Sequence, residues 1–289
     1  MLKDMRSLTL FAALLPWAAM PANAQEHKPI QVHGHRGARA RMPENTIPAF
    51  EYAIEAGVDV LELDLAVTKD NVLVVSHDPE LHAPVCKGPV EKAVIRELTL
   101  EQVKEWDCGA VRNPRFHEQK TIPGTRIPTF DEVLALAPRS RVEFNVETKS
   151  FPDQPQYTPP PAEFARLLIE AVKRHKLEKR VMIQSFDFRT LKEARKIAPG
   201  IRLSVLYERG PKDFVTLSKE AANAEIVSPE YHLVTTEKVI AAHAKGLLVV
   251  PWTANTVADW DRLIRAGVDA IISDDPAALI THLKKEGLR

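Results

Sequence analysis

From residue 31 onward, the chain alternates between short apolar runs and stretches with a helical hydrophobic period. The apolar runs, which we predict as strands, cover residues 31–36, 58–66, 141–149, 180–186, 201–207, 224–228, 247–252 and 269–273. The amphipathic stretches, which we predict as helices, cover residues 46–56, 129–137, 162–175, 188–197, 212–222, 236–245, 256–266 and 276–285. This alternation predicts an α/β fold, a (β/α)8 TIM barrel. A doubly wound open sheet is the alternative, but no Gly-x-Gly-x-x-Gly follows the first strand.

Two segments interrupt the alternation. Residues 68–71 leave room only for a tight turn before a further apolar run at 72–76, which predicts a hairpin on the second strand, because a parallel crossover needs a dozen residues or more. The return arm carries His77 back toward the carboxyl end of that strand. Residues 79–128 are too long for an ordinary loop, and we predict a small inserted lobe over the barrel mouth. No linker marks a second domain, so residues 25–289 are predicted to form one domain.

The first 24 residues are typical of a signal peptide. A short charged start precedes an apolar run over residues 8–20, and residues 22–24 read Ala-Asn-Ala, the small-x-small pattern of a cleavage site. The apolar run is too short to span a bilayer. We therefore expect cleavage near Ala24 and a periplasmic or secreted protein. In such an oxidising compartment, we expect Cys86 and Cys108 to form a disulfide.

The composition narrows the possible partners. Lys and Arg together number 39, as do Asp and Glu, so the chain lacks the basic excess of nucleic-acid-binding proteins. With 45% hydrophobic and 27% charged residues, it is typical of globular rather than disordered proteins. We therefore expect a small-molecule substrate, no nucleic-acid partner and no membrane span; the composition does not determine the oligomeric state.

Acidic residues occupy the face of two predicted strands that should point into the barrel. Glu62 and Asp64 alternate with leucines, and Glu147 alternates with apolar residues of the third strand. Alternate side chains share a face, and the aliphatic face packs against the outer helices. Three carboxylates at one mouth predict an oxygen-ligand site for one hard divalent cation, Ca²⁺ or Mg²⁺, rather than zinc. Solvated charges on an exposed sheet edge are the alternative, but two strands carry the same pattern.

Histidines and cations accompany these carboxylates. His35 ends the first strand and His77 returns on the hairpin, and imidazole can donate or accept a proton near neutral pH. Arg36 and Lys149 add fixed positive charge. Together with a divalent cation, these groups suit a phosphoester, whose anionic oxygens need neutralising and whose leaving oxygen needs a proton.

Several short motifs follow one another in a fixed order. They are His35-Arg36-Gly37, Pro43-Glu44-Asn45-Thr46, Glu62-Leu63-Asp64, Thr68-Lys69-Asp70, His77-Asp78, Glu147-Thr148-Lys149, Gln184-Ser185-Phe186 and Trp252-Thr253-Ala254-Asn255. This ordered set, which spans most of the chain, resembles the glycerophosphodiester phosphodiesterase family. The resemblance implies a metal-dependent barrel that cleaves glycerophosphodiesters to glycerol 3-phosphate and an alcohol. Thr148 departs from the aliphatic residue usual at its position, but its side chain is expected to face the helices.

By position, the resemblance also assigns roles. It implies that His35 and His77 form an acid/base pair. Glu62, Asp64 and Glu147 match the metal ligands of the family, and Arg36 and Lys149 match its phosphate contacts. Gln184 is expected to reach the mouth from its strand. Trp252 fits two interpretations equally, as core filler or as a wall against the glycerol moiety. The resemblance leaves open whether water or the glycerol 2-hydroxyl attacks first.

Other polar residues have plainer interpretations. Asn45 and Thr46 lie where the first helix begins, so helix capping explains them at least as well as chemistry does. Glu44 either caps the same turn or approaches the metal from outside, and we favour capping. His33 is expected to lie buried behind the site. Surface or packing positions are expected for five histidines that carry no pattern, namely His82, His117, His175, His232 and His243.

Two rival functions remain. A lysophospholipase D or sphingomyelinase D resembles this family and uses a similar pair of histidines, but the motif at residues 43–46 favours a glycerophosphodiesterase. A long acyl chain would also need an apolar groove. A protein that binds anions without cleaving them would tolerate the loss of either histidine, and here both His35 and His77 are present.

Overall fold

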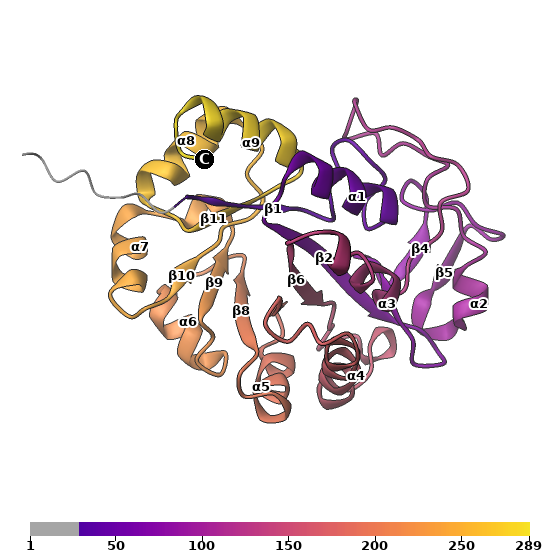
Figure 1. Cartoon of the computed structure of the whole chain (residues 1–289). Coiled ribbons are helices and arrows are strands. Elements are labelled where there is room, and N and C mark those ends of the chain that lie inside the picture. Colours follow the sequence, from indigo (N-terminus) through magenta and orange to yellow (C-terminus); the bar gives the residue numbers. More distant parts are fainter. Residues whose placement is uncertain (1–28) are drawn as a thin grey trace, which may run out of the picture.

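The computed structural model describes residues 29–289, so the predicted signal peptide lies outside the described residues. Eight parallel strands form a barrel that is surrounded by helices (Figure 1). In spatial order they are β10 (Leu248–Val249), β9 (Ile226–Pro229), β8 (Arg202–Tyr207), β7 (Val181–Ser185), β6 (Glu143–Thr148), β2 (Val60–Val67), β1 (Gln31–Gly34) and β11 (Ala270–Ser273). Backbone hydrogen bonds from Asp269 N to Val249 O (3.1 Å) and from Ile272 N to Pro251 O (3.0 Å) join β10 to β11. The predicted TIM barrel is confirmed, although β10 is shorter than the predicted run at 247–252.

Helices cover the outer face of the barrel. They are α1 (Ile47–Ala56), α3 (Phe130–Leu134), α4 (Pro161–Arg174), α5 (Phe188–Ile197), α6 (Phe214–Glu220), α7 (Thr236–His243), α8 (Val257–Ala266) and α9 (Pro276–Lys285). Leu61, Leu63 and Leu65 of β2 are fully buried in the apolar layer between strands and helices. The alternate residues of β2 therefore point into the barrel, as the period of two requires. Among the described residues, no helix is long and apolar enough to cross a membrane.

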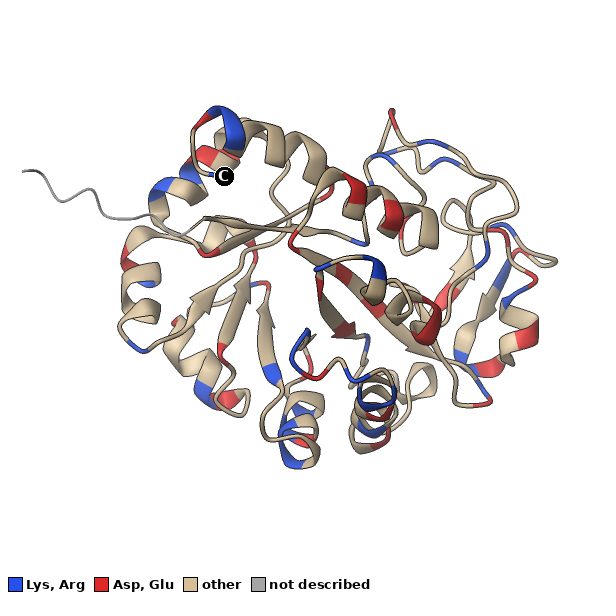
Figure 2. Ribbon diagram, viewed as in Figure 1, with Lys and Arg blue, Asp and Glu red and all other residues tan. Residues whose placement is uncertain are grey.

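The barrel interior has an apolar layer and a polar layer. The apolar layer contains six buried residues from five strands or strand ends: Val60, Met182, Ile226, Val250, Ala270 and Ile272. Glu62 and Asp64 of β2 and Glu147 of β6 lie closer to the carboxyl ends of these strands than this apolar layer does. Figure 2 marks the acidic positions along both strands. The carboxyl ends of barrel strands are where the active sites of such folds lie.

The predicted hairpin is present. β3 (Leu73–Val75) runs antiparallel to β2, with Leu65 opposite Val75. The ladder continues by one bond, because Ser76 N donates to Asp64 O at 3.0 Å. His77 is the next residue, so the β2 register determines where it lies.

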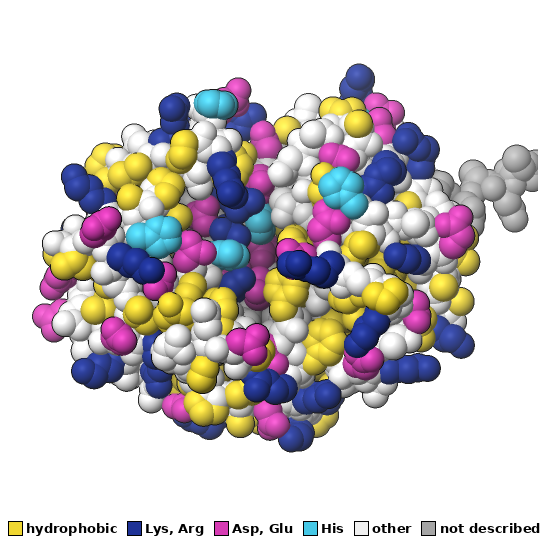
Figure 3. Space-filling model, turned by 180° about the vertical axis from the view of Figure 1, so that it is seen from behind, with side chains coloured by type: hydrophobic (Ala, Val, Ile, Leu, Met, Phe, Trp, Pro, Cys, Tyr) yellow, Lys and Arg dark blue, Asp and Glu magenta, His cyan; other side chains and the backbone are white. Residues whose placement is uncertain are grey.

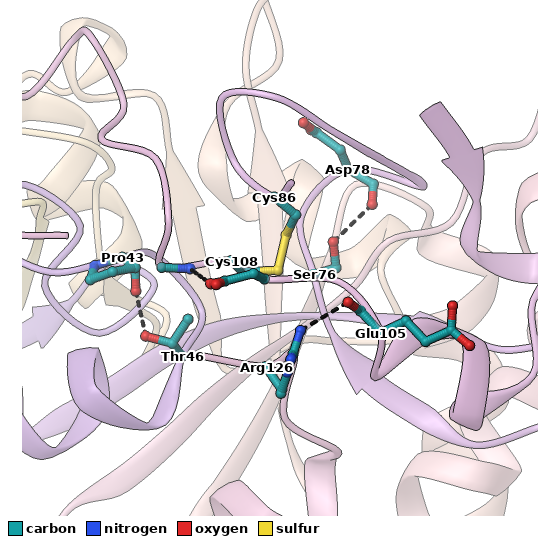
Figure 4. Close-up of a disulfide and its surroundings, with 10 residues drawn as sticks. Pro43, Thr46, Ser76, Asp78, Cys86, Glu105, Cys108 and Arg126 are labelled. Carbon is teal, nitrogen blue, oxygen red and sulfur yellow. Dashed lines mark hydrogen bonds between the residues drawn. A yellow bond between two sulfur atoms is a disulfide. The ribbon is translucent and has the colours of Figure 1, made fainter. Parts of the chain in front are cut away.

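The inserted lobe, residues 79–128, packs mainly beside the barrel. It holds β4 (Glu80–His82), β5 (Lys92–Val94), α2 (Leu100–Val103) and a small core with Trp106. The predicted disulfide joins Cys86 to Cys108 within this core (Figure 4). The same core includes Ala66 of β2 and Val74 of β3, so the lobe rests on the hairpin. Our expectation of a lobe lying over the mouth is therefore only partly correct: one loop of the lobe reaches the mouth.

Candidate active site

Three buried carboxylates meet at the carboxyl end of the barrel. Glu62, Asp64 and Glu147 each offer an oxygen within 4.8 Å of those of the other two. Glu62 and Asp64 share the inner face of β2, two residues apart. Asp64 is paired in register with Glu147 of β6, so the parallel ladder itself brings the three together. An all-carboxylate set of this kind provides the hard oxygen ligands that Ca²⁺ and Mg²⁺ prefer.

The three carboxyl groups of this cluster differ in the direction of their pKa shifts. Burial raises the pKa of Glu62 well above its usual range, and the neighbouring charges of Asp64 and Glu147 raise it further. Burial also raises the pKa of Glu147. Burial acts on the pKa of Asp64 in the same direction, but Arg36 and other cations outweigh it and hold that pKa below its usual range. The residues present therefore fit a divalent cation, whose charge would favour the ionised forms of Glu62 and Glu147.

Two buried cations lie beside the carboxylates. Arg36 directs Nη1 to Glu44 Oε1 at 2.6 Å and Nε toward Asp64 Oδ2 at 3.2 Å. Its backbone N–H donates to Glu62 Oε2 at 2.9 Å. Lys149 places Nζ 2.8 Å from Glu147 Oε1. Both side chains line the cavity, where they could contact the oxygens of an anionic substrate.

His35 directly follows β1 and is held from the far end of the chain. Its Nδ1 lies 2.5 Å from Asp274 Oδ1, and its Nε2 lies 3.9 Å from Glu62 Oε2. Asp274 directly follows β11 and also accepts hydrogen bonds from Arg39 and Asn255. Burial, together with the nearby Arg39, lowers the pKa of His35 to about 4. A ring that is neutral at neutral pH can accept a proton, as a general base must.

His77 approaches from the hairpin. Its Nδ1 lies 2.7 Å from Asp78 Oδ1, and this hydrogen bond is the main reason that the pKa of Asp78 is lowered. His82, which we expected at a surface or packing position, places Nε2 3.5 Å from the other oxygen of Asp78. His77 therefore lines the cavity with one nitrogen held by a carboxylate.

These residues surround a cavity of about 200 Å³. Figure 3 shows a hollow near the centre of this face, with acidic and histidine side chains in it and Lys and Arg side chains beside it. One side is apolar and is formed by Phe186, Leu206 and Trp252. The rings of Phe186 and Trp252 meet edge to face at 5.5 Å, and Trp252 Nε1 donates to Ser228 O at 2.8 Å. Trp252 thus both packs internally and forms a wall.

The structure brings all nine predicted site residues to this end of the barrel. Eight of them line the cavity, namely His35, Arg36, Glu62, His77, Glu147, Lys149, Gln184 and Trp252, and Asp64 lies in the carboxylate cluster. Gln184 reaches the mouth by donating from Nε2 to Glu62 Oε1 at 2.7 Å. Thr148 hydrogen bonds to Thr190 of α5, so it faces the helices as expected.

Two of the capping expectations are wrong. Thr46 alone is the cap of α1, where its hydroxyl accepts from Ala49 N. Asn45 adopts a left-handed conformation (φ 56°) and donates from Nδ2 to Asp64 Oδ2 at 2.9 Å. Glu44 pairs with Arg36. Both side chains therefore belong to the polar network of the site. His33 is buried, as expected.

Three further residues of the site escaped the sequence reasoning. Asp274 holds His35 and accepts from Arg39, and Arg115 of the inserted lobe lines the mouth. The position of Asp274, directly after the last predicted strand, was a usable signal, because catalytic groups of barrels lie at strand ends. Arg115 had no such signal, since no periodic pattern surrounds it.

Comparison with known proteins gives one consistent result. Residues 35–278 match the model of the glycerophosphoryl diester phosphodiesterase family. A glycerophosphodiester phosphodiesterase of Caldanaerobacter subterraneus subsp. tengcongensis is 35% identical over 262 residues, which cover 89% of this chain and 98% of that protein. A solved structure from Silicibacter pomeroyi DSS-3, provisionally named a glycerophosphoryl diester phosphodiesterase, has a TM-score of 0.84 at 30% identity and covers 90% of this chain and 95% of its own. An Oleispira antarctica phosphodiesterase, solved with the product sn-glycerol-3-phosphate, shares the fold with a TM-score of 0.76 at 22% identity, covering 89% of this chain and 97% of its own.

Proposed function

The chain belongs to the glycerophosphoryl diester phosphodiesterase family, and from this premise we propose that it hydrolyses glycerophosphodiesters to glycerol 3-phosphate and an alcohol. One observation carries the proposal: a buried carboxylate triad, two histidines and two buried cations line the same cavity. Cleavage of a phosphodiester uses each of these groups, because the anionic oxygens must be neutralised, the attacking oxygen must lose a proton and the leaving oxygen must gain one. The family match and the geometry of the cavity thus support the same reaction.

Glu62, Asp64 and Glu147 would hold one divalent cation, Ca²⁺ or Mg²⁺. Such an ion supplies Lewis acidity toward the phosphoryl oxygens. Gln184 orients Glu62 through its 2.7 Å hydrogen bond, and Asn45 orients Asp64 at 2.9 Å. Partners of this kind fix the direction in which ligand oxygens point.

His35 acts as the general base. The proton on Nδ1 is held by Asp274, which leaves Nε2 to take a proton from the attacking oxygen as that oxygen forms its bond to phosphorus. His77, in its protonated form, gives a proton to the departing alcohol oxygen as the bond from that oxygen to phosphorus breaks. Asp78 holds the His77 ring through Nδ1.

The remaining residues bind and orient the substrate. Arg36 and Lys149, at the floor of the cavity, contact the oxygens of the bound phosphate. Trp252 and its partner Phe186 pack against the carbon skeleton of the glycerol moiety, on the apolar side of the cavity.

We also propose that the protein is exported. Residues 1–24 would be removed near Ala24, leaving residues 25–289 as one barrel domain that carries the lobe at 79–128. The disulfide of that lobe is consistent with an oxidising compartment such as the periplasm. Sequencing the amino terminus of the protein recovered from the extracytoplasmic fraction tests this part directly.

The experiment that tests the activity is a substrate panel. Purified protein is given glycerophosphocholine, glycerophosphoglycerol and lysophosphatidylcholine, with Ca²⁺, with Mg²⁺ or with a chelator, and released glycerol 3-phosphate and choline are measured. Formation of glycerol 3-phosphate that stops with chelator supports the proposal. Turnover of lysophosphatidylcholine alone would instead indicate a lysophospholipase D.

A further inference from the structure

Arg115 lines the mouth of the cavity but has no part in the chemistry proposed above. Within the described residues, only its backbone N–H makes a hydrogen bond, and no carboxylate lies within 4.0 Å of its guanidinium. The other two arginines of the cavity are neutralised by close partners, Arg36 by Glu44 and Arg39 by Asp274. Arg115 therefore presents an uncompensated positive charge to whatever enters the mouth.

The loop that carries Arg115 is fixed to the barrel on the side of Arg39. Gln119 is buried, and its Nε2 donates to Arg39 O at 2.7 Å, while its Oε1 accepts from Asn113 N at 2.8 Å. The ring of Phe116 lies 5.2 Å from the Arg39 guanidinium. The loop is thus anchored on both sides of Arg115, so little conformational freedom of the loop remains to be lost when a ligand binds.

The cationic side chains of the cavity lie at different depths, which separates their roles. Arg36 and Lys149 are buried beside the carboxylates, where the scissile phosphate would bind. Arg115 is exposed and lies at the rim. The cavity also has an apolar wall of Phe186, Leu206 and Trp252. A charge at the rim is therefore placed to contact a group that extends beyond the scissile phosphate.

We propose that Arg115 selects diesters whose alcohol portion carries a further anionic group, such as a second phosphate or a carboxylate. The proposal rests on the proposed function and specifies its substrate class. A guanidinium presents a planar pair of donors that matches phosphate and carboxylate oxygens, which an ammonium group cannot do. The same charge disfavours a quaternary ammonium head group such as that of choline.

The test compares three diesters that differ in head-group charge. They are glycerophosphoglycerol phosphate (anionic), glycerophosphoglycerol (neutral) and glycerophosphocholine (cationic), and kcat/KM is measured for each with the full mature chain. Wild-type protein should prefer the anionic diester. Arg115→Gln should lower kcat/KM for the anionic diester roughly fivefold, the size expected of an exposed charge pair, and leave the neutral one unchanged. Arg115→Lys should recover part of the loss.

Lys120→Gln is the matched control. Lys120 is exposed on the same loop, does not line the cavity, and its substitution removes the same charge. It should leave all three values unchanged, whereas raising the salt concentration should weaken the wild-type preference. Equal losses on all three diesters for Arg115→Gln, or no loss at all, would overturn the inference while leaving the proposed function standing. No turnover of any diester with Ca²⁺ or Mg²⁺ would overturn both.

Discussion

Nδ1 of His35 lies 2.5 Å from Oδ1 of Asp274, a residue 239 positions away in the sequence. Burial raises the pKa of Asp274, but the charges of His35 and Arg39 outweigh it, so that this pKa lies below its usual range. An ionised carboxylate can only accept, so the proton of the neutral ring resides on Nδ1. The relationship therefore determines the tautomer of His35 and leaves its Nε2 unprotonated.

Asp274→Asn should lower kcat about a hundredfold, because the amide no longer holds the proton on Nδ1. Divalent-cation affinity should not change, since Asp274 is not a ligand. Asp275→Asn is the control: Asp275 caps α9, and Asn caps helices equally well. Steady-state kinetics and calorimetric cation binding measure both effects. A wild-type kcat for Asp274→Asn would contradict the orienting role.

Replacing Glu62 or Glu147 by Gln should weaken Ca²⁺ or Mg²⁺ binding about tenfold or more, because a charged ligand is lost. In the absence of cation, Glu62→Gln should raise Tm, since it removes a buried charge that Asp64 and Glu147 repel. Glu147→Gln should not raise Tm, since it leaves the buried Lys149 without its 2.8 Å partner. Glu143 is the control, because it lies on β6 as Glu147 does but pairs with Arg202 at 2.7 Å. Glu143→Gln should change neither the cation affinity nor the rise in Tm that the cation produces. Melting curves with and without cation test this; identical cation-induced gains in all variants would exclude the triad.

Cation affinity should fall as the pH is lowered. Burial raises the pKa values of Glu62 and Glu147, so these groups hold protons at a pH where ordinary carboxyls are ionised. A cation must displace those protons, and higher pH therefore favours binding. Titration calorimetry in two buffers of different ionisation enthalpy measures the protons released. Affinity and heat that do not vary with pH or buffer would refute this linkage.

The two histidines should respond differently to the leaving group. His77→Ala should lose at least about a hundredfold in kcat on a choline diester but far less on a nitrophenyl ester, because an acidic alcohol leaves without protonation. His35→Ala should be impaired on both. Equal losses for His77→Ala on the two substrates would remove its role as general acid, and the reversed pattern would exchange the two roles.

Replacing both Cys86 and Cys108 by Ala should lower the free energy of unfolding by about 3 kcal/mol, the chain-entropy value for a loop of this size. The lobe should loosen more than the barrel, because its small core includes both sulfurs. Denaturant unfolding combined with limited proteolysis tests this, with cleavage expected inside residues 79–128. Two free thiols in the exported wild-type protein would contradict the bridge.

The meeting of the three carboxylates could be predicted because the inner face of a strand is a local property. Glu62 and Asp64 alternate with leucines, and this period alone places them inside the barrel. The contacts of Asn45 could not be predicted, because its left-handed backbone turns its amide away from the helix and toward Asp64. Asp274 meets His35 only because β1 and β11 are neighbours in the closed barrel. Arg115 depends on the course of a loop that has no hydrophobic period.

Because Ser76 N donates to Asp64 O, His77 takes its position from the barrel before the chain enters the lobe. Insertions, deletions or sequence drift within residues 79–128 therefore need not move His77 or the three carboxylates. Under our proposal for Arg115, remodelling of that segment can change the alcohol that is accepted while the carboxylates and histidines of the site stay in place. The hairpin thus separates the part of the enzyme that can diversify from the part that cannot.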